Sequence, residues 1–310
     1  MATAGPGYRA LHESAAWLDL SAHGKIRVTG EDRVRLLQAI LSNDVKGLQP
    51  GQGNYQFLLN AQAHILADAN LYVFPDHILL DVEPEVTARV FEHLDKYIIA
   101  DDVQLEDVTG RLATIAIEGP TADEVAGVAV PTEPGAHVEH DSLIVARNSA
   151  TGQRGVWFFL DRARKAELVA RLEHAGALAA TSEDARVVRV ENAIPRYGDD
   201  FNDTTLPQET QQHTRAVHFN KGCYLGQEIV ERIRSRGQVH RALAQLTIEG
   251  EDPPEQKSAI LAGKQEVGRL TSPVYSPRLG RCLGLAILRH EFAALHTPLV
   301  VAGRAAVVLR

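Results

Sequence analysis

The chain has 310 residues, of which 45% are hydrophobic and 23% are charged, and its formal net charge is −8. This length exceeds what a single hydrophobic core usually supports, so we expect two or three domains in a soluble globular protein. The net negative charge argues against a protein held on nucleic acid by phosphate contacts alone, and no hydrophobic run is long enough to span a membrane.

The first third of the sequence alternates between strand and helix patterns. Residues 25–28 alternate polar and apolar side chains, as a half-buried strand does. A helix follows from about residue 31 to 42, and a second one runs from Pro84 to about Ile98, because proline favours the first helical turn. Further strands are predicted at 55–59, 65–74 and 77–82. These patterns predict a first α+β subdomain over residues 1–110.

The middle of the chain repeats this makeup. We predict a strand at 111–118, a hairpin formed by 142–147 and 154–160, and a helix that Asp161 caps. Another helix begins near Ser182 and ends at Pro195, since proline lacks the N–H that the next turn needs. Antiparallel sheets covered by helices are typical of the α+β class, and we place the second subdomain at residues 111–240.

From residue 242 onward the pattern changes to short strands between glycine and proline turns. This composition is typical of a small β barrel, which we place at residues 241–310. Cys282 lies within one of the apolar strands, so we interpret it as a buried structural thiol.

The cysteines limit the cellular setting. Only Cys223 and Cys282 are present, and neither belongs to a Cys-x-x-Cys motif. This excludes a disulfide framework and indicates a reducing, intracellular compartment. The first nine residues show neither a signal-peptide core nor an Arg-rich amphipathic pattern, so we expect a cytoplasmic protein. Two cysteines are also too few to hold an iron–sulfur cluster, which usually takes four thiolates.

Reactive groups are densest in the octet Lys221–Glu228, which reads KGCYLGQE. Lys221 precedes Cys223 by two residues, so an extended backbone would place both side chains on one side. A nearby cation favours the reactive thiolate. The alternative is a glycine turn that leads into a helix or strand, with Cys223 buried as a small hydrophobic residue.

The octet and the arginine that follows it resemble the signature of the YgfZ proteins. These are folate-binding relatives of the glycine-cleavage T protein, an aminomethyltransferase. The segments Gly24–Gly30, Leu58–Asp68 and Val267–Ser272 are similar to that family as well. The resemblance implies three domains around a central channel that holds tetrahydrofolate. It also implies that Cys223, tuned by Lys221, acts as a nucleophile or redox thiol, and that further residues shape the folate pocket: Tyr224, Gln227, Glu228 and Arg232.

Glu191 matches the glutamate of the Arg-x-Glu stretch that holds the pterin in these relatives. A pterin presents adjacent N–H donors on one edge, which a carboxylate accepts in bidentate fashion. The alternative for Glu191 is a solvated helix face. The chain departs from the family at Ala63-His64, where Gly-Arg is frequent. Residues 81–88 also lack the Asn-x-x-x-Arg stretch and following aspartate of the aminomethyltransferases, which points away from glycine cleavage.

The resemblance therefore implies a tetrahydrofolate-binding protein that assists assembly or repair of iron–sulfur clusters in client enzymes, including tRNA-modifying ones. The alternative is a folate-dependent one-carbon transferase or demethylase. The arginines between Arg232 and Arg241 suggest an anion site, either for the glutamate tail of a folate or for RNA phosphate, so direct tRNA binding is a third hypothesis. The alternative for these arginines is an exposed strand with alternating charges. His137 and His140 lack a third ligand, so no metal site is predicted.

Overall fold

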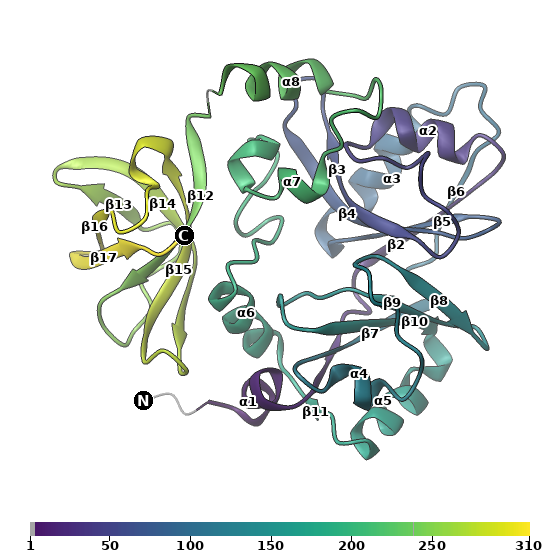
Figure 1. The fold of residues 1–310 in the computed structure, drawn as a ribbon, viewed down its shortest axis with the longest axis horizontal. Coiled ribbons are helices and arrows are strands. Elements are labelled where there is room, and N and C mark those ends of the chain that lie inside the picture. The colour runs from purple at the N-terminus through teal and green to yellow at the C-terminus, as the bar shows by residue number, and fades with distance from the viewer. Residues whose placement is uncertain (1–3, 238) are drawn as a thin grey trace.

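The computed structural model describes residues 4–237 and 239–310. It contains two mainly antiparallel sheets that pack face to face, and a closed barrel beside them (Figure 1). The predicted α+β class with a C-terminal β barrel is therefore confirmed. The division at residues 110 and 240 stays a sequence prediction.

The first sheet has the strand order β3-β4-β5-β2-β6. Helix α2 (Arg33–Ile40) and helix α3 (Thr87–Asp95) cover its outer face, because each turns a hydrophobic stripe toward it. The strands are β2 (Gly24–Thr29), β3 (Gly53–Leu59), β4 (Ile65–Val73), β5 (Ile78–Val82) and β6 (Gln104–Asp107).

The second sheet has the order β11-β1-β7-β10-β9-β8, and its outer face is covered by α4 (Ala122–Ala126) and α5 (Lys165–His174). Strand β1 belongs to this sheet although the strands of the first sheet follow it directly in sequence. The strands are β1 (Ala16–Asp19), β7 (Leu112–Glu118), β8 (His137–His140), β9 (Leu143–Arg147), β10 (Gly155–Asp161) and β11 (Leu178–Ala179).

The inner faces of the two sheets share one hydrophobic core. Tyr72 of β4 and Leu79 of β5 meet Trp157 and Phe159 of β10 there, while their neighbours in sequence face the helices. Alternation along each strand thus produces four layers, helix, sheet, sheet and helix. Toward one end of this interface polar side chains take over, and a cavity opens.

Helix α6 (Ser182–Glu191) joins the two sheets to the barrel. It begins with a capping box, in which Thr181 and Asp184 satisfy each other's backbone N–H groups. Its Val190 packs against barrel residues that include Leu243 and Leu285. Helix α1 (Pro6–Glu13), which sequence reasoning missed, also packs against α6.

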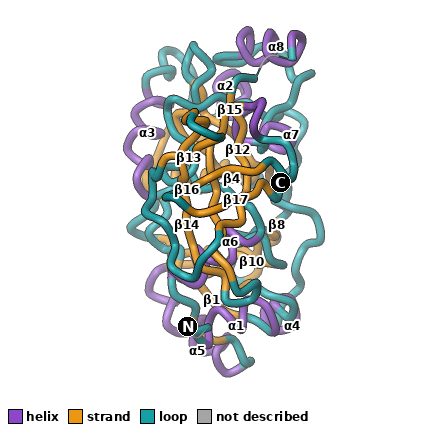
Figure 2. The backbone as a smooth tube through the Cα atoms, turned by 90° about the vertical axis from the view of Figure 1, so that its left-hand side faces the viewer, coloured by secondary structure: helices purple, strands orange, loops and turns teal. Residues whose placement is uncertain are grey.

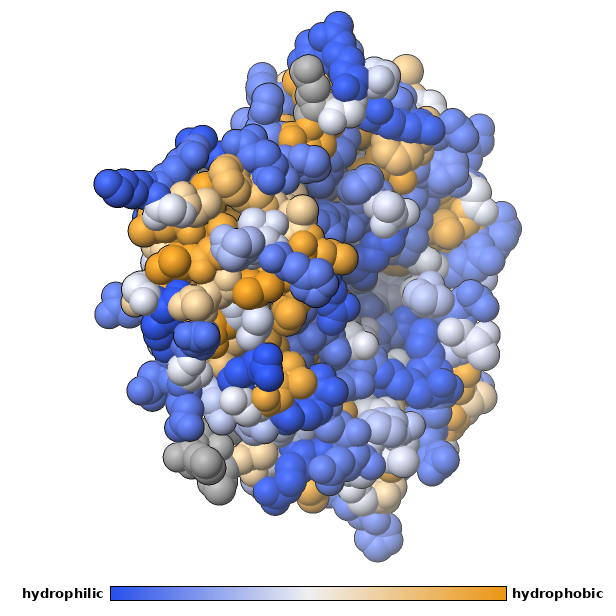
Figure 3. Space-filling view, turned by 60° about the vertical axis from the view of Figure 1, so that its left-hand side comes forward, coloured by the Kyte–Doolittle hydropathy of each residue, from blue (hydrophilic) through white to orange (hydrophobic). Residues whose placement is uncertain are grey.

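The barrel closes in the order β12-β15-β14-β13-β16-β17. Cys282 is buried in its core, as predicted. Hydrophobic side chains gather on the outward face of the barrel, whereas the surface between it and the sheets is mostly hydrophilic (Figure 3). The strands are β12 (Arg241–Ile248), β13 (Ala259–Ala262), β14 (Gln265–Ser276), β15 (Arg281–Arg289), β16 (Pro298–Val301) and β17 (Arg304–Val308).

Two local predictions differ from the structure. Helix α6 ends at Glu191 rather than at Pro195, because Ala193 takes a left-handed conformation with φ of 56°. The predicted loop at 201–214 includes a 3-10 turn (Pro207–Thr210) and the start of α7 (His213–Ala216), and it leads through the octet into α8 (Gln227–Arg236), which projects at one end of the molecule (Figures 1 and 2). Within the described residues, no helix is long and hydrophobic enough to cross a membrane.

Candidate functional site

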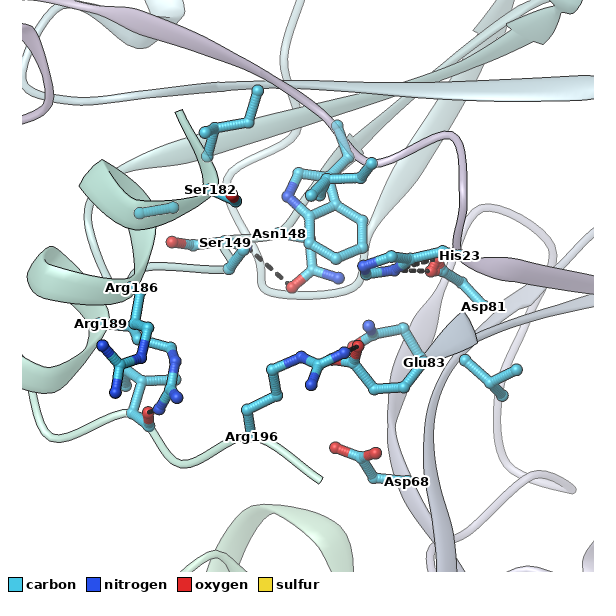
Figure 4. A pocket seen from close by; sticks show the side chains of 18 of the residues that line it. His23, Asp68, Asp81, Glu83, Asn148, Ser149, Ser182, Arg186, Arg189 and Arg196 are labelled. Atoms are coloured by element: carbon cyan, nitrogen blue, oxygen red, sulfur yellow. Dashed lines mark hydrogen bonds and ion pairs between the residues drawn. The ribbon is translucent and has the colours of Figure 1, made fainter. Parts of the chain in front are cut away.

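A cavity of about 580 Å³ lies where both sheets meet α6 and the segment that follows it (Figure 4). This volume is in the range of small-molecule sites. One wall carries carboxylates from the first sheet, and the opposite wall carries arginines from α6. The residues used below are Tyr55, Asp68, Asn70, Asp81 and Glu83 from the first sheet, His23, Asn148 to Ala150 and Trp157 from around the second, and Arg186, Arg189, Arg196 and Arg215.

Asp68, on β4, is a cavity carboxylate with only one of its two oxygens hydrogen-bonded. Its Oδ2 accepts a hydrogen bond of 2.6 Å from the Tyr55 hydroxyl. Its Oδ1 is shielded from solvent and has no hydrogen-bond partner among the described residues. Burial raises the pKa of Asp68 despite the Tyr55 hydrogen bond. A carboxylate in this state is ready to accept an N–H group or a proton from a ligand.

Tyr55 makes a cation–π contact with an arginine. The Arg215 guanidinium lies 4.0 Å from the centre of its ring. Burial raises the pKa of Tyr55 well above its ordinary value, and the Asp68 carboxylate raises it further. The phenol therefore stays protonated and donates to Asp68.

Glu83 lies at the end of β5, on the same polar face. Its Oε2 is 2.7 Å from the Arg196 guanidinium, although the two are not aligned as a hydrogen bond. Burial raises the pKa of Glu83 to about 7, while His23 and Arg196 act in the opposite direction. The Asp68 carboxylate adds to the increase. Glu83 thus changes protonation near neutral pH.

The arginines that line the cavity differ in their contacts with the rest of the protein. Arg189 already binds protein groups, since it donates hydrogen bonds to the Asp199 and Asp200 carboxylates at 2.8 and 2.7 Å. Arg186 has only a 3.3 Å contact with Glu183, one turn earlier on α6. Arg186 and the exposed Arg215 are therefore the cations best able to bind an anionic group.

The loop after β9 forms a further part of the cavity wall and is anchored by a buried carboxylate. Glu118 accepts hydrogen bonds from the Ser149 hydroxyl and from the backbone N–H groups of Ala150 and Thr151, at 2.8, 2.6 and 3.0 Å. This network fixes the backbone of the loop, so the wall is preorganised.

Glu191 is buried away from the cavity. Its carboxylate accepts from the hydroxyls of Tyr8, at 2.6 Å, and Ser276, and it lies 2.8 Å from His12 Nε2. Burial opposes ionisation, but these hydrogen bonds outweigh it and lower the pKa of Glu191. The structure therefore does not place Glu191 among the cavity residues, because its oxygens already bind α1 and the barrel. Its role in pterin binding stays a prediction.

Lys221 and Cys223 also lie outside the cavity lining. The Lys221 ammonium donates to the carbonyl oxygens of Leu41 and Asn43, at 2.6 Å each, and anchors the octet to the end of α2. No hydrogen bond joins it to Cys223 among the described residues. Cys223 is exposed, so the alternative of a buried thiol does not hold. The structure does not bring this pair together with Glu191.

The other octet residues are divided between the core and the surface. Tyr224 is buried, and its hydroxyl has no partner in the described chain. Gln227 begins α8 and is half-buried, whereas Glu228 and Arg232 are exposed on that helix. None of the four lines the cavity. Their contact with folate stays a prediction.

Comparison with known proteins identifies the family to which the chain belongs. Residues 3–221 match the GCVT N-terminal domain, and residues 241–308 match the glycine cleavage T-protein C-terminal barrel domain. The chain belongs to the glycine cleavage T-protein family. Membership confirms the broader of the two resemblances, whereas the narrower one, to the YgfZ proteins, stays a prediction.

Relatives of this family are similar over nearly the whole chain. An aminomethyltransferase from Nostoc sp. is 28% identical over 95% of this chain and 82% of its own length. One from Rubrobacter xylanophilus is 29% identical, with coverage of 92% and 80%. The crystal structure of the glycine cleavage system aminomethyltransferase T from Bartonella henselae superposes with a TM-score of 0.90 at 19% identity, covering 98% of this chain and 87% of that one. The two proteins share the same fold.

Sequence reasoning missed the cavity carboxylates, although one signal could have found them. Asp68 and Asn70 are two residues apart on a strand that is otherwise largely hydrophobic, so both face the same side of the sheet. Two polar groups on the inner face of a largely hydrophobic strand indicate that the core ends there and that a polar site begins.

Proposed function

We propose that the protein binds tetrahydrofolate in the cavity and transfers a one-carbon unit between folate and an amine. The observation that carries this proposal is the state of Asp68, whose Oδ1 is buried and unpaired while the Tyr55 hydroxyl occupies Oδ2. A buried acceptor without a partner costs free energy, which a ligand N–H recovers on binding.

The two walls of the cavity suit the two ends of a folate. The acidic wall, with Asp68 and Glu83, accepts N–H groups of a reduced pteridine. On the opposite wall, Arg186 can bind a carboxylate of the glutamate tail. The volume of about 580 Å³ accommodates a ring system between them.

Bound tetrahydrofolate supplies the ring nitrogen that accepts the one-carbon unit. Asp68 is placed to take the proton which that nitrogen loses, and its raised pKa suits a group that cycles between both protonation states. Tyr55 holds the carboxylate in place. The family relatives named aminomethyltransferase support this kind of chemistry.

Calorimetric titration with tetrahydrofolate tests the proposal. We expect binding by the wild type and a loss of at least about tenfold in affinity for Asp68→Asn, because the amide offers a donor where the carboxylate accepts. Cys223→Ala and Glu191→Ala should retain binding. Absence of binding by the wild type would overturn the proposal. Turnover with an aminomethyl donor or a lipoyl protein then separates a transferase from a folate-binding protein without this activity.

Assistance of iron–sulfur cluster assembly is the second candidate function, and one observation favours it. The Cys223 thiol is exposed at the surface, outside the cavity, where a client protein can reach it. Together with the resemblance of the octet, this supports a role for Cys223 in the assembly or repair of iron–sulfur clusters that client enzymes carry, including tRNA-modifying ones. Cys223→Ala would then reduce client cluster content while leaving tetrahydrofolate affinity unchanged. Unchanged cluster content would remove this candidate.

We infer that a direct contact with tRNA, if it occurs, involves helix α8. Arg232, Arg234 and Arg236 are exposed on α8, whereas Arg241 is paired with Glu209 at 2.8 Å. We infer that any tRNA affinity depends on the three α8 arginines and falls steeply with salt. The absence of binding at low salt would exclude it.

A further inference from the structure

A histidine–aspartate pair forms part of the cavity wall and has no role in the function described so far. His23 lies between β1 and β2, and its Nδ1 is 3.1 and 3.2 Å from the two oxygens of Asp81 on β5. Asp81 is only 1% exposed. The His23 ring borders the cavity with 15% of its side chain accessible, and its Nε2 has no hydrogen-bond partner in the described chain (Figure 4).

The surroundings fix the orientation of this pair. Asp81 is paired across the first sheet with Lys25 on β2 and with Asn70 on β4. The buried Lys25 ammonium donates to the carbonyl oxygens of Ser21 and His23, which holds the backbone that carries the imidazole. Asp81 accepts at Nδ1, so that nitrogen keeps its proton and Nε2 is the atom left to exchange one with a ligand.

The charges around His23 favour its protonated form. Asp81 and Glu83 face it from β5 and the residues just beyond, and Lys25 faces it from β2 with the opposite effect. Trp157 of β10 packs edge-on at 5.8 Å and carries no charge. Burial acts against the charge, but the Asp81 and Glu83 carboxylates together outweigh it, so the pKa of His23 is raised above its ordinary value.

We propose that the His23–Asp81 pair is the proton donor of the cavity and serves the amine nitrogen that leaves the one-carbon unit. This inference rests on the proposed one-carbon transfer. It concerns a one-carbon unit at the oxidation level of formaldehyde, so the transfer needs no oxidant.

The step is balanced as follows. A bond forms between the folate nitrogen and the carbon, while the bond from that carbon to the donor amine breaks and its electron pair goes to the amine nitrogen. His23 Nε2 gives its proton to that nitrogen, and the imidazole becomes neutral. Its Nδ1 keeps its own proton and continues to donate it to the Asp81 carboxylate. Asp68 takes the proton from the folate nitrogen. One proton enters the cavity wall and one leaves it.

The cavity wall contains a group suited to each of the two proton transfers. Asp68 and His23 both act on the charge of Glu83, which indicates that Glu83 lies within electrostatic range of both. Asp68 has an empty acceptor oxygen, and His23 has a free N–H in its protonated form. The acceptor and the donor of the proposed transfer therefore belong to one polar face.

The first test observes the imidazoles directly by NMR titration of the full chain, with His23 assigned from His23→Gln. His77 is a matched control, because it pairs with Asp76 at 2.8 Å but does not line the cavity. We expect His23 to titrate above the ordinary range and to move downward in Asp81→Asn. Added tetrahydrofolate should shift the His23 signals and leave those of His77 unchanged. A His23 that titrates normally and ignores the ligand would overturn the inference.

The second test is the pH profile of turnover with an aminomethyl donor. Because the protonated form acts, activity should fall as pH rises through the pKa of His23. His23→Gln should lower kcat by about 100-fold and abolish this alkaline limb, while His77→Gln leaves both unchanged. An unchanged profile in His23→Gln would overturn the inference even where tetrahydrofolate binds. Failure of the wild type to bind tetrahydrofolate would instead overturn the proposed function. The two failures can be distinguished, because the titration of His23 is measured without the ligand.

Discussion

Glu191 is buried, and Asp68 lines the cavity with one oxygen shielded from solvent; the two carboxylates are in opposite states. Both oxygens of Glu191 receive protein donors, from α1 and from the barrel, and the pKa of Glu191 is lowered. Asp68 receives one donor, from Tyr55, and its other oxygen has no partner in the described chain. Its pKa is raised, chiefly by burial.

The difference teaches how to separate a structural carboxylate from a functional one. A carboxylate whose acceptors are all occupied stabilises the fold and has little capacity for a ligand. One that is buried with a free oxygen reduces stability unless a ligand supplies the missing donor. By this criterion Glu191 stabilises the contacts between α1, α6 and the barrel, whereas Asp68 is available to bind a ligand.

The largest expected effect is the loss of turnover in Asp68→Asn. We expect a decrease of about 100-fold or more in folate-dependent one-carbon transfer, because the proton acceptor is removed. The fold should survive, since an amide is easier to bury than a charge. Asp76→Asn, at a largely exposed position, is the control and should retain full activity. Equal activity of both variants would remove Asp68 from the site.

The second effect is a loss of stability in Glu191→Ala. This change leaves the Tyr8 and Ser276 hydroxyls buried without their acceptor, so we expect the free energy of unfolding to fall by about 3 kcal/mol. Urea denaturation measures it. Glu183→Ala, on the exposed side of the same helix, should change it by less than about 0.5 kcal/mol. Tetrahydrofolate affinity should stay within about threefold; a larger loss would restore Glu191 as a ligand.

The third effect concerns acid stability. The pKa of Glu191 in the folded protein lies below its ordinary value of 4.5, so at acidic pH the unfolded chain binds more protons there than the folded chain. Stability should therefore fall as pH falls below about 4.5 and towards the folded pKa. Urea midpoints measured between about pH 3 and 6 should depend less on pH in Glu191→Ala than in the wild type. Parallel curves would contradict this.

The smallest effect is an expected absence of change at the octet. Iodoacetamide should label the exposed Cys223 well before the buried Cys282, whose pKa is raised by burial. Saturating tetrahydrofolate should leave the rate at Cys223 unchanged, because this residue does not line the cavity. Protection of Cys223 by the ligand would move the folate site toward the octet.

The regular elements could be predicted because hydrophobic alternation decides them. Strands β4 and β5 and the barrel all follow from periodicity and turn residues. Helix α1 was missed because it has only eight residues, and its stability comes from packing on α6 rather than from its own sequence.

The site was harder to predict because it depends on which side chains lack partners. Glu191 and Asp68 both lie in segments similar to the family, and nothing in the local sequence says that Tyr8 and Ser276 reach Glu191 from 183 and 85 residues away. The structure explains one feature of the octet, the glycine at position 226. Gly226 has a positive φ of 82°, and a Cβ there would meet the Asn60 carbonyl oxygen at 2.8 Å, so this segment is fitted closely to the first sheet.

The contacts of Tyr8 also bear on the order in which the molecule assembles during translation. Its hydroxyl donates to Glu191 and accepts from the backbone N–H of Arg278, which lies 270 residues further along the chain. Helix α1 leaves the ribosome well before Arg278 is synthesised, because 270 residues separate Tyr8 from Arg278. Closure of so long a loop is entropically costly, so we expect α1 to dock only after the barrel has formed. Premature termination before the barrel would leave the amino-terminal helix undocked and open to proteolysis.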